Sequence, residues 1–206
     1  MFKSEELFDL AQTEHAKLFD DCEFAWDALK RLKNYVKANL RPALRNRCVG
    51  NAFIDENVFI GEGTIIEDGV MIKGSVIIGK NCEIRQGAYI REHSVIGDNC
   101  VVGHCSEIKH SVLFNGAQVP HFNYVGDSIL GHKAHLGAGV KISNVKLVPG
   151  NIFMEIDGKP FDTGLRKFGA LLGDFAEVGC NSVLNPGSII GRNSIIYPNV
   201  NWREIL

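Results

Sequence analysis

The chain has 206 residues, a net charge of −2 and an apolar fraction of 45%. This composition predicts one large globular domain, or one domain with an appendage, and it argues against a disordered chain or a strongly basic nucleic-acid-binding protein. No run of about 18 apolar residues occurs, so the sequence predicts no membrane span.

The N-terminal residues and the cysteines predict a cytoplasmic protein. The stretch MFKSEELFDLAQTEH is charged and amphipathic throughout and lacks the apolar core of a signal peptide. The six cysteines form no CxxC pair and no zinc-ligand spacing. We interpret them as reduced thiols that serve mostly as small apolar side chains.

Residues 1–49 are predicted to form a helical extension. Apolar residues recur at helical spacing over residues 7–19 and again over residues 25–36. Asp20 or Asp21 is a candidate N-cap of the second helix, and Arg41-Pro42 is expected to end it. The domain that follows is predicted below to be a β-solenoid, whose open end would expose unpaired strand edges. We therefore expect the extension to cap that end.

The segment 30–47 carries seven positive charges and no acid. Such a run could attract a phosphorylated ligand or a nucleic acid, but a solvated helix face is the favoured interpretation.

From residue 50 onward the sequence follows a six-residue repeat. The fifth position of most hexads is small or β-branched, and the fourth is often glycine or asparagine, which tolerate positive φ. One large apolar residue recurs in each hexad: Ile54, Ile60, Ile66, Ile72, Ile78, Ile84, Ile90, Ile96, Val102, Ile108 and Phe114. This pattern predicts a β-solenoid over residues 50–206, in which three hexads form a triangular coil of 18 residues.

Two interruptions of the repeat are predicted to be loops outside the coil. The spacing from Phe114 to Leu130 is two hexads plus four residues, which suggests a four-residue insertion containing His121. A longer external loop is expected at residues 145–169, after which the repeat resumes at Leu172 and continues to Ile196. Loops carried by a rigid scaffold are common positions for binding and chemistry.

The hexads resemble the left-handed β-helix acyltransferases, and in particular the C-terminal acetyltransferase domain of bifunctional sugar-phosphate nucleotidyltransferases. The similarity runs from about residue 51 to residue 198 and is carried by the motifs EIK (107–109), HFNYVGDSILG (121–131), LGAG (136–139) and RKFGALLGD (166–174). It implies a mainly β fold, a left-handed parallel β-helix with an N-terminal helical extension. It also implies acetyl-CoA-dependent N-acetylation of an amino-sugar phosphate such as glucosamine-1-phosphate, in UDP-N-acetylglucosamine synthesis.

The resemblance also implies roles for individual residues. His121 matches the catalytic general base, and an imidazole with the ordinary pKa of about 6.5 is largely neutral at cellular pH. The substrate-binding positions of the family correspond to Arg91, Lys109, Tyr124, Asn144 and Lys167, of which the cations would hold the sugar phosphate. Acetyl-CoA would contact Cys180 and Pro198. Cys180 stands where the family has serine, His135 where it has asparagine and Val145 where it has tyrosine.

The histidines allow a second interpretation. His104, His110, His132 and His135 lie close together in the sequence, and the γ-type carbonic anhydrases bind zinc through histidines on neighbouring hexads. Their spacing differs from that zinc pattern, so surface or structural histidines are favoured and no metal or tightly bound cofactor is predicted.

The family also implies partners. Its coils pack as homotrimers with active sites between subunits, so we expect a homotrimer that binds acetyl-CoA and an amino-sugar phosphate, and no nucleic acid or membrane. The motif for nucleotide binding found in the other half of such enzymes is missing from these residues. A non-catalytic trimeric scaffold or regulatory partner of a separate nucleotidyltransferase is therefore an alternative.

Overall fold

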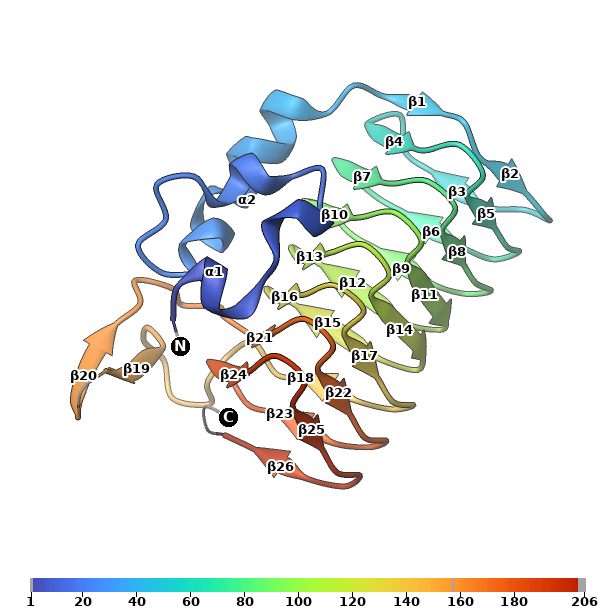
Figure 1. Cartoon of the computed structure of the whole chain (residues 1–206). Coiled ribbons are helices and arrows are strands. Elements are labelled where there is room, and N and C mark those ends of the chain that lie inside the picture. Colours follow the sequence, from blue (N-terminus) through green and yellow to red (C-terminus); the bar gives the residue numbers. More distant parts are fainter. Residues whose placement is uncertain (1, 157, 204–206) are drawn as a thin grey trace.

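A computed structural model of the chain describes residues 2–156 and 158–203. The predicted domain 50–206 and the predicted loop 145–169 therefore each include residues outside the described part, 204–206 and 157 respectively. The described residues form a left-handed parallel β-helix with a helical layer on one side (Figure 1).

Three parallel sheets of eight strands form the walls of the solenoid. Sheet A contains β1 (Ala43–Leu44), β4 (Val58–Ile60), β7 (Val76–Ile78), β10 (Ser94–Ile96), β13 (Val112–Leu113), β16 (Ile129–Leu130), β21 (Ala170–Leu172) and β24 (Ser188–Ile190). Sheet B contains β2 (Arg47–Cys48), β5 (Ile65–Ile66), β8 (Glu83–Ile84), β11 (Val101–His104), β14 (Gln118–His121), β17 (His135–Leu136), β22 (Glu177–Val178) and β25 (Ile195–Ile196). Sheet C contains β3 (Phe53–Ile54), β6 (Met71–Ile72), β9 (Tyr89–Ile90), β12 (Glu107–Lys109), β15 (Tyr124–Gly126), β18 (Lys141–Ile142), β23 (Val183–Leu184) and β26 (Asn201–Trp202).

The repeat builds the coils as the sequence predicted. The large apolar residues stack in register, as in Ile60 on Ile78 and Ile78 on Ile96, and they are fully buried. Several fourth-position residues turn the corners with positive φ, for example Gly63 at 75° and Asn81 at 52°. Of the six cysteines, Cys82 and Cys100 are buried in this core, so the thiols are not mostly interior side chains as expected.

The prediction of a four-residue insertion around His121 is wrong. Leu113, not Phe114, stacks on Ile96 and Leu130 inside the coil, whereas Phe114 faces outward into the helical layer. The partners Ile96, Leu113 and Leu130 are each 17 residues apart, because the turn from sheet C to sheet A is one residue shorter in these two coils. His121 therefore ends β14 on the coil wall instead of lying in a loop outside it.

The N-terminal segment is less helical than expected. It contains the α-helices α1 (Ser4–Leu7) and α2 (Asp27–Asn39) and two short 3-10 helices, Leu10–Gln12 and Ala16–Phe19. Trp26 is the N-cap of α2, so neither Asp20 nor Asp21 caps it, and the helix ends just before Arg41-Pro42 as predicted.

This segment does not cap the open end of the solenoid. It packs on the outer face of sheet A, where Phe8, Trp26 and Leu32 are buried together with Val95 and Ile129 (Figure 1). The first coil is left with exposed apolar side chains, Leu44, Val49 and Phe53. Because β1 and β2 already pair with sheets A and B, the solenoid begins before the predicted boundary at residue 50. At the other end, Trp202 packs against the solenoid core.

The predicted external loop contains a β-hairpin, β19 (Phe153–Ile156) and β20 (Lys159–Asp162). Its apolar side chains Ile152 and Met154 are buried with the helical layer, and Phe161 lies 4.9 Å from Phe24, ring centre to ring centre. The loop is therefore anchored to the N-terminal segment.

Candidate active site on sheet C

The predicted site residues gather on sheet C and on the two corners that border it. Lys109 and Tyr124 lie on sheet C strands, and Arg91 directly follows β9. Asn144 lies two residues after β18, at the corner that leads from sheet C to sheet A. His121, Cys180 and Pro198 lie at the opposite corner, between sheets B and C.

A buried carboxylate occupies the corner from sheet C to sheet A. Asp127 is 5% exposed, and its Oδ2 lies 3.6 Å from Lys109 Nζ and accepts a hydrogen bond from Asn144 Nδ2. Its Oδ1 lies 3.1 Å from His110 Nδ1. The one-residue-shorter turns place Asp127 and His110 at positive φ, 50° and 45°, so the two residues occupy equivalent positions in neighbouring coils.

The protonation of Asp127 follows from these contacts. Burial by itself raises the pKa of a carboxyl group, because it disfavours the charged form. The contacts with His110 and Asn144 and the charge of Lys109 outweigh burial, and together they hold the pKa of Asp127 below its usual value. The carboxylate is therefore ionised at neutral pH and neutralises Lys109.

Arg91 is also paired with an acid. Its Nη1 donates a 2.9 Å hydrogen bond to Glu107 Oε1, and this bond raises the pKa of Arg91. The guanidinium also lies 5.7 Å from the ring centre of Tyr89. Arg91 Nε is buried, donates no hydrogen bond among the described residues and lies 3.9 Å from Glu92 Oε2, so a second acid also faces this guanidinium.

Tyr124 and Lys167 approach the same corner. Asn144 Nδ2 lies 3.4 Å from Tyr124 Oη, which links the tyrosine to the Asp127 cluster. The returning end of the external loop is fixed by Phe168, whose backbone N–H donates to the carbonyl of Asn144. Lys167 directly precedes this anchor and is exposed, with no ion pair in the described part of the chain.

His121 lies on the opposite border of sheet C. Its backbone N–H donates to Asn123 Oδ1, and its carbonyl accepts a 2.9 Å hydrogen bond from Gly139 N–H. Asn123 is buried and its Nδ2 also donates to the carbonyl of Gly137, so one amide side chain supports the turn. The His121 side chain is exposed and has no hydrogen-bond partner in residues 2–156 and 158–203.

Cys180 and Pro198 lie further along the corner that carries His121. They line a cavity of about 220 Å³ together with His135. The structure does not bring these two residues into contact with the Asp127 cluster. A second cavity, of about 570 Å³, lies beside the external loop and is lined by Ser143, Val145, Lys146 and Val183 among others.

Sequence analysis missed Asp127 and His110 as members of the site. A signal was present, because Asp127 is an acid in the otherwise apolar and small run YVGDSIL.

No group of three or more histidine, cysteine or acidic side chains that could hold a metal occurs among the described residues. No described helix is long and apolar enough to cross a membrane.

Comparisons with known proteins find similarity over part of the chain. Residues 72–156 match the family described as the GMPPB C-terminal domain. The chain is 37% identical over 92 residues to a bifunctional sugar-1-phosphate nucleotidylyltransferase/acetyltransferase of Sulfurisphaera tokodaii, an alignment that covers 45% of this chain and 23% of the relative. It is 38% identical over 97 residues to the bifunctional protein GlmU of Methanococcus maripaludis, with 47% of this chain and 23% of the relative covered.

These matches confirm the resemblance to the bifunctional sugar-phosphate nucleotidyltransferase/acetyltransferases over the aligned part of the chain. The aligned part spans less than a quarter of the length of these curated relatives. Among solved structures, UDP-N-acetylglucosamine O-acyltransferase (LpxA) of Moraxella catarrhalis matches 75% of this chain and 66% of its own, with a TM-score of 0.48 and 18% identity.

Proposed function

We propose that this hexapeptide-repeat protein is an acetyl-CoA-dependent N-acetyltransferase that acts on an amino-sugar phosphate such as glucosamine-1-phosphate, in nucleotide-sugar synthesis. The observation that carries the proposal is the gathering of Arg91, Lys109, Tyr124 and Asn144 on one side of sheet C, with His121 on its border. A homotrimer and a cytoplasmic location are parts of this proposal.

The proposed chemistry is a single acyl transfer. The sugar amine attacks the thioester carbonyl carbon, a C–N bond forms, and the C–S bond to coenzyme A breaks. His121, exposed and without a competing hydrogen bond, takes a proton from the attacking nitrogen and passes it to the leaving thiolate as coenzyme A departs. Acetyl-CoA would lie along the corner that carries Cys180 and Pro198.

The sugar phosphate would be held at the corner from sheet C to sheet A. Arg91 offers its Nη2, which makes no hydrogen bond among the described residues, and Lys167 is an exposed cation on the returning loop. Lys109 is already neutralised by Asp127, so it binds phosphate by exchanging that carboxylate for the phosphate and otherwise holds Asp127 in place.

A homotrimer is compatible with the sheet surfaces that the chain's own helical layer does not cover. Sheet A is covered by the chain's own helical layer, so the outer faces of sheets B and C are the ones available for packing against other copies. Sheet C carries most of the proposed site, and a neighbouring copy could contribute Lys167 to it.

A second function is favoured by one observation. Arg91 and Lys109, the cations expected to bind phosphate, are both paired with acids of the same chain, Glu107 and Asp127. This arrangement also suits a non-catalytic trimeric scaffold, or a regulatory partner of a separate nucleotidyltransferase, in which the same charges only stabilise the coil.

The test is release of coenzyme A thiol from acetyl-CoA, with glucosamine-1-phosphate and galactosamine-1-phosphate as acceptors. Wild type, His121→Ala and His104→Ala are compared. His104 is the matched control because it is the β-sheet partner of His121 one coil earlier and is also located at this corner.

The proposal expects turnover in wild type and in His104→Ala, and a loss of at least about 100-fold in His121→Ala, the usual contribution of a general base. Turnover that survives in His121→Ala would refute the assigned base. No turnover with either sugar, combined with no binding of acetyl-CoA by calorimetry, would favour the scaffold.

A further inference from the structure

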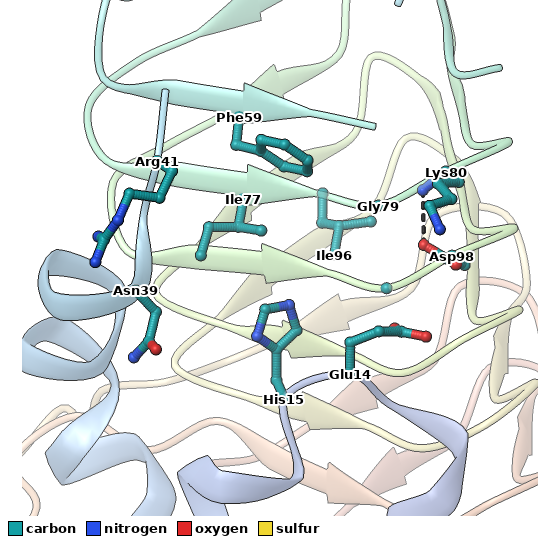
Figure 2. A pocket seen from close by; sticks show the side chains of 11 residues that line it. Glu14, His15, Asn39, Arg41, Phe59, Ile77, Gly79, Lys80, Ile96 and Asp98 are labelled. Atoms are coloured by element: carbon teal, nitrogen blue, oxygen red, sulfur yellow. Dashed lines mark hydrogen bonds between the residues drawn. The ribbon is translucent and has the colours of Figure 1, made fainter. Parts of the chain in front are cut away.

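A cavity of about 370 Å³ lies between the N-terminal segment and the solenoid, on the side of the molecule formed by sheet A (Figure 2). Its walls come from the segment at Glu14 and His15, from the end of α2 at Asn39 and Arg41, and from the first coils of sheet A. This volume lies within the usual range of small-molecule sites. The cavity is separate from sheet C, where the proposed acetyl transfer takes place.

The floor of the cavity is apolar. Phe59 and Ile77 are outward-facing residues of neighbouring sheet A strands. The helical layer covers the later coils of this sheet, and Phe59 and Ile77 line the cavity. The backbone of Gly79 also lines the wall, and a Cβ at this position would lie 2.3 Å from Asp98 Oδ1. This floor offers a flat apolar surface for a ring or an aliphatic chain.

His15 provides a hydrogen-bonding group in the middle of the cavity. Its Nδ1 lies 3.0 Å from Tyr35 Oη, and Figure 2 shows its ring pointing toward Ile96. Burial lowers the pKa of His15 and raises the pKa of Tyr35, so the imidazole is neutral and the hydroxyl stays protonated at neutral pH. The second ring nitrogen of His15, Nε2, has no hydrogen-bond partner in the described part of the chain.

The two ends of the cavity carry opposite charge. Figure 2 shows Arg41 at one end and Lys80 with Asp98 at the other, with Glu14 below them. Arg41 Nη1 is held by the carbonyls of Ala38 and Leu40, which orients the guanidinium and leaves its other nitrogens free.

The acidic end also has spare acceptors. Asp98 Oδ1 accepts from Lys80 N–H, and Glu14 Oε1 lies 3.4 Å from Asn115 Nδ2. The second oxygen of each carboxylate has no partner among the described residues. Two acids and one lysine leave this end with a net negative charge.

We propose that this cavity binds a small molecule with an apolar ring or chain as its body, a carboxylate at the end near Arg41 and an ammonium group at the end near Glu14 and Asp98. The apolar body lies on Phe59 and Ile77, and His15 lies between the two charged ends. Two backbone carbonyls hold Arg41 and the Lys80 N–H holds Asp98 before the ligand arrives, which lowers the entropic cost of binding.

The test uses 4-(aminomethyl)benzoate as the probe, with 4-methylbenzoate and benzylamine as fragments that each carry one of its two charges. Binding is followed by ligand-observed NMR titration to the millimolar range. Arg41→Gln and Glu14→Gln remove one charge from each end of the cavity. Arg45→Gln is the matched control, because Arg45 belongs to the same basic segment but does not line the cavity.

The full probe should bind more tightly than either fragment. Arg41→Gln should weaken binding of the probe and of 4-methylbenzoate about tenfold, the effect of one lost charge-assisted hydrogen bond, and leave benzylamine unchanged. Glu14→Gln should give the reverse selectivity, and Arg45→Gln should change nothing. The proposal is overturned if no probe gives saturable binding to wild type, or if Arg45→Gln weakens binding as much as Arg41→Gln while all variants keep the wild-type circular dichroism spectrum.

Discussion

Replacing Asp127 with asparagine should destabilise the solenoid in a pH-dependent way. The substitution keeps the shape of the side chain and removes the charge opposite Lys109, whose side chain is only 14% exposed. At 3.6 Å and an effective dielectric constant of about 20, the lost attraction is about 5 kcal/mol. A neutral amide costs less to bury than a carboxylate, so we expect a net loss of about 3 kcal/mol, the low end of the range for breaking a buried pair.

The pH dependence follows from the lowered pKa of Asp127. The unfolded carboxyl titrates at about 3.9, and a lower pKa in the folded protein means that ionisation stabilises the fold. This contribution is complete above the unfolded pKa and is lost as the pH falls through the folded pKa. The difference in free energy of unfolding between wild type and Asp127→Asn should therefore be largest near neutral pH. It should shrink once the pH drops below the pKa of the unfolded carboxyl.

Urea unfolding followed by circular dichroism, at neutral and at acidic pH, measures both effects. Asp162→Asn is the control: Asp162 is exposed and also has a lowered pKa, but it lies in the β19–β20 hairpin away from any buried cation. Equal stability of Asp127→Asn and wild type at neutral pH, or the same loss at both pH values, would show that the buried charge pair does not stabilise this corner.

Three further substitutions test other parts of the structure. Phe114→Ala should lower the free energy of unfolding by about 3–5 kcal/mol. It should also speed hydrogen exchange in the N-terminal segment, since Phe114 joins that segment to sheet A. Unchanged exchange in that segment would contradict this packing. Asn123→Ala leaves the backbone N–H of His121 without its acceptor and should cost about 1–3 kcal/mol, measured by urea unfolding. Glu107→Gln frees Arg91 and should lower the KM for the phosphorylated acceptor without changing kcat; a higher KM would show that the pair is needed for binding.

The solenoid could be predicted from the sequence because its information is local. One large apolar residue in every hexad and a turn residue at the corner are enough to define a coil wall, and Ile60, Ile78 and Ile96 stack as expected. The sequence also contains a second periodicity, beside the six-residue repeat, that indicates a covered outer face on sheet A. One apolar residue per coil points outward, as at Ile77, Val95 and Ile129, and this recurrence every 18 or 17 residues marks a covered face.

The shortened turns were misinterpreted for a physical reason. Leu113 and Phe114 are adjacent and both apolar, and a one-residue deletion moves the inward position from one to the other. The sequence pattern alone favours the uninterrupted period, which selects Phe114. Side-chain alternation in a strand means that only the stacking on Ile96 and Leu130 identifies the inward residue.

The sequence by itself determined the coil, the second helix, the place of the long loop and the residues that match the acyltransferase motifs. Only the tertiary structure decided that the N-terminal segment packs on sheet A, that Asp127 is buried between Lys109 and Asn144, and that a charged cavity forms at His15. The contacts of the N-terminal segment with sheet A and the walls of the cavity join residues that are tens of residues apart. Asp127 lies only one coil, 18 or 17 residues, from Lys109 and Asn144, but the six-residue pattern describes the buried apolar positions and does not show that these polar side chains meet.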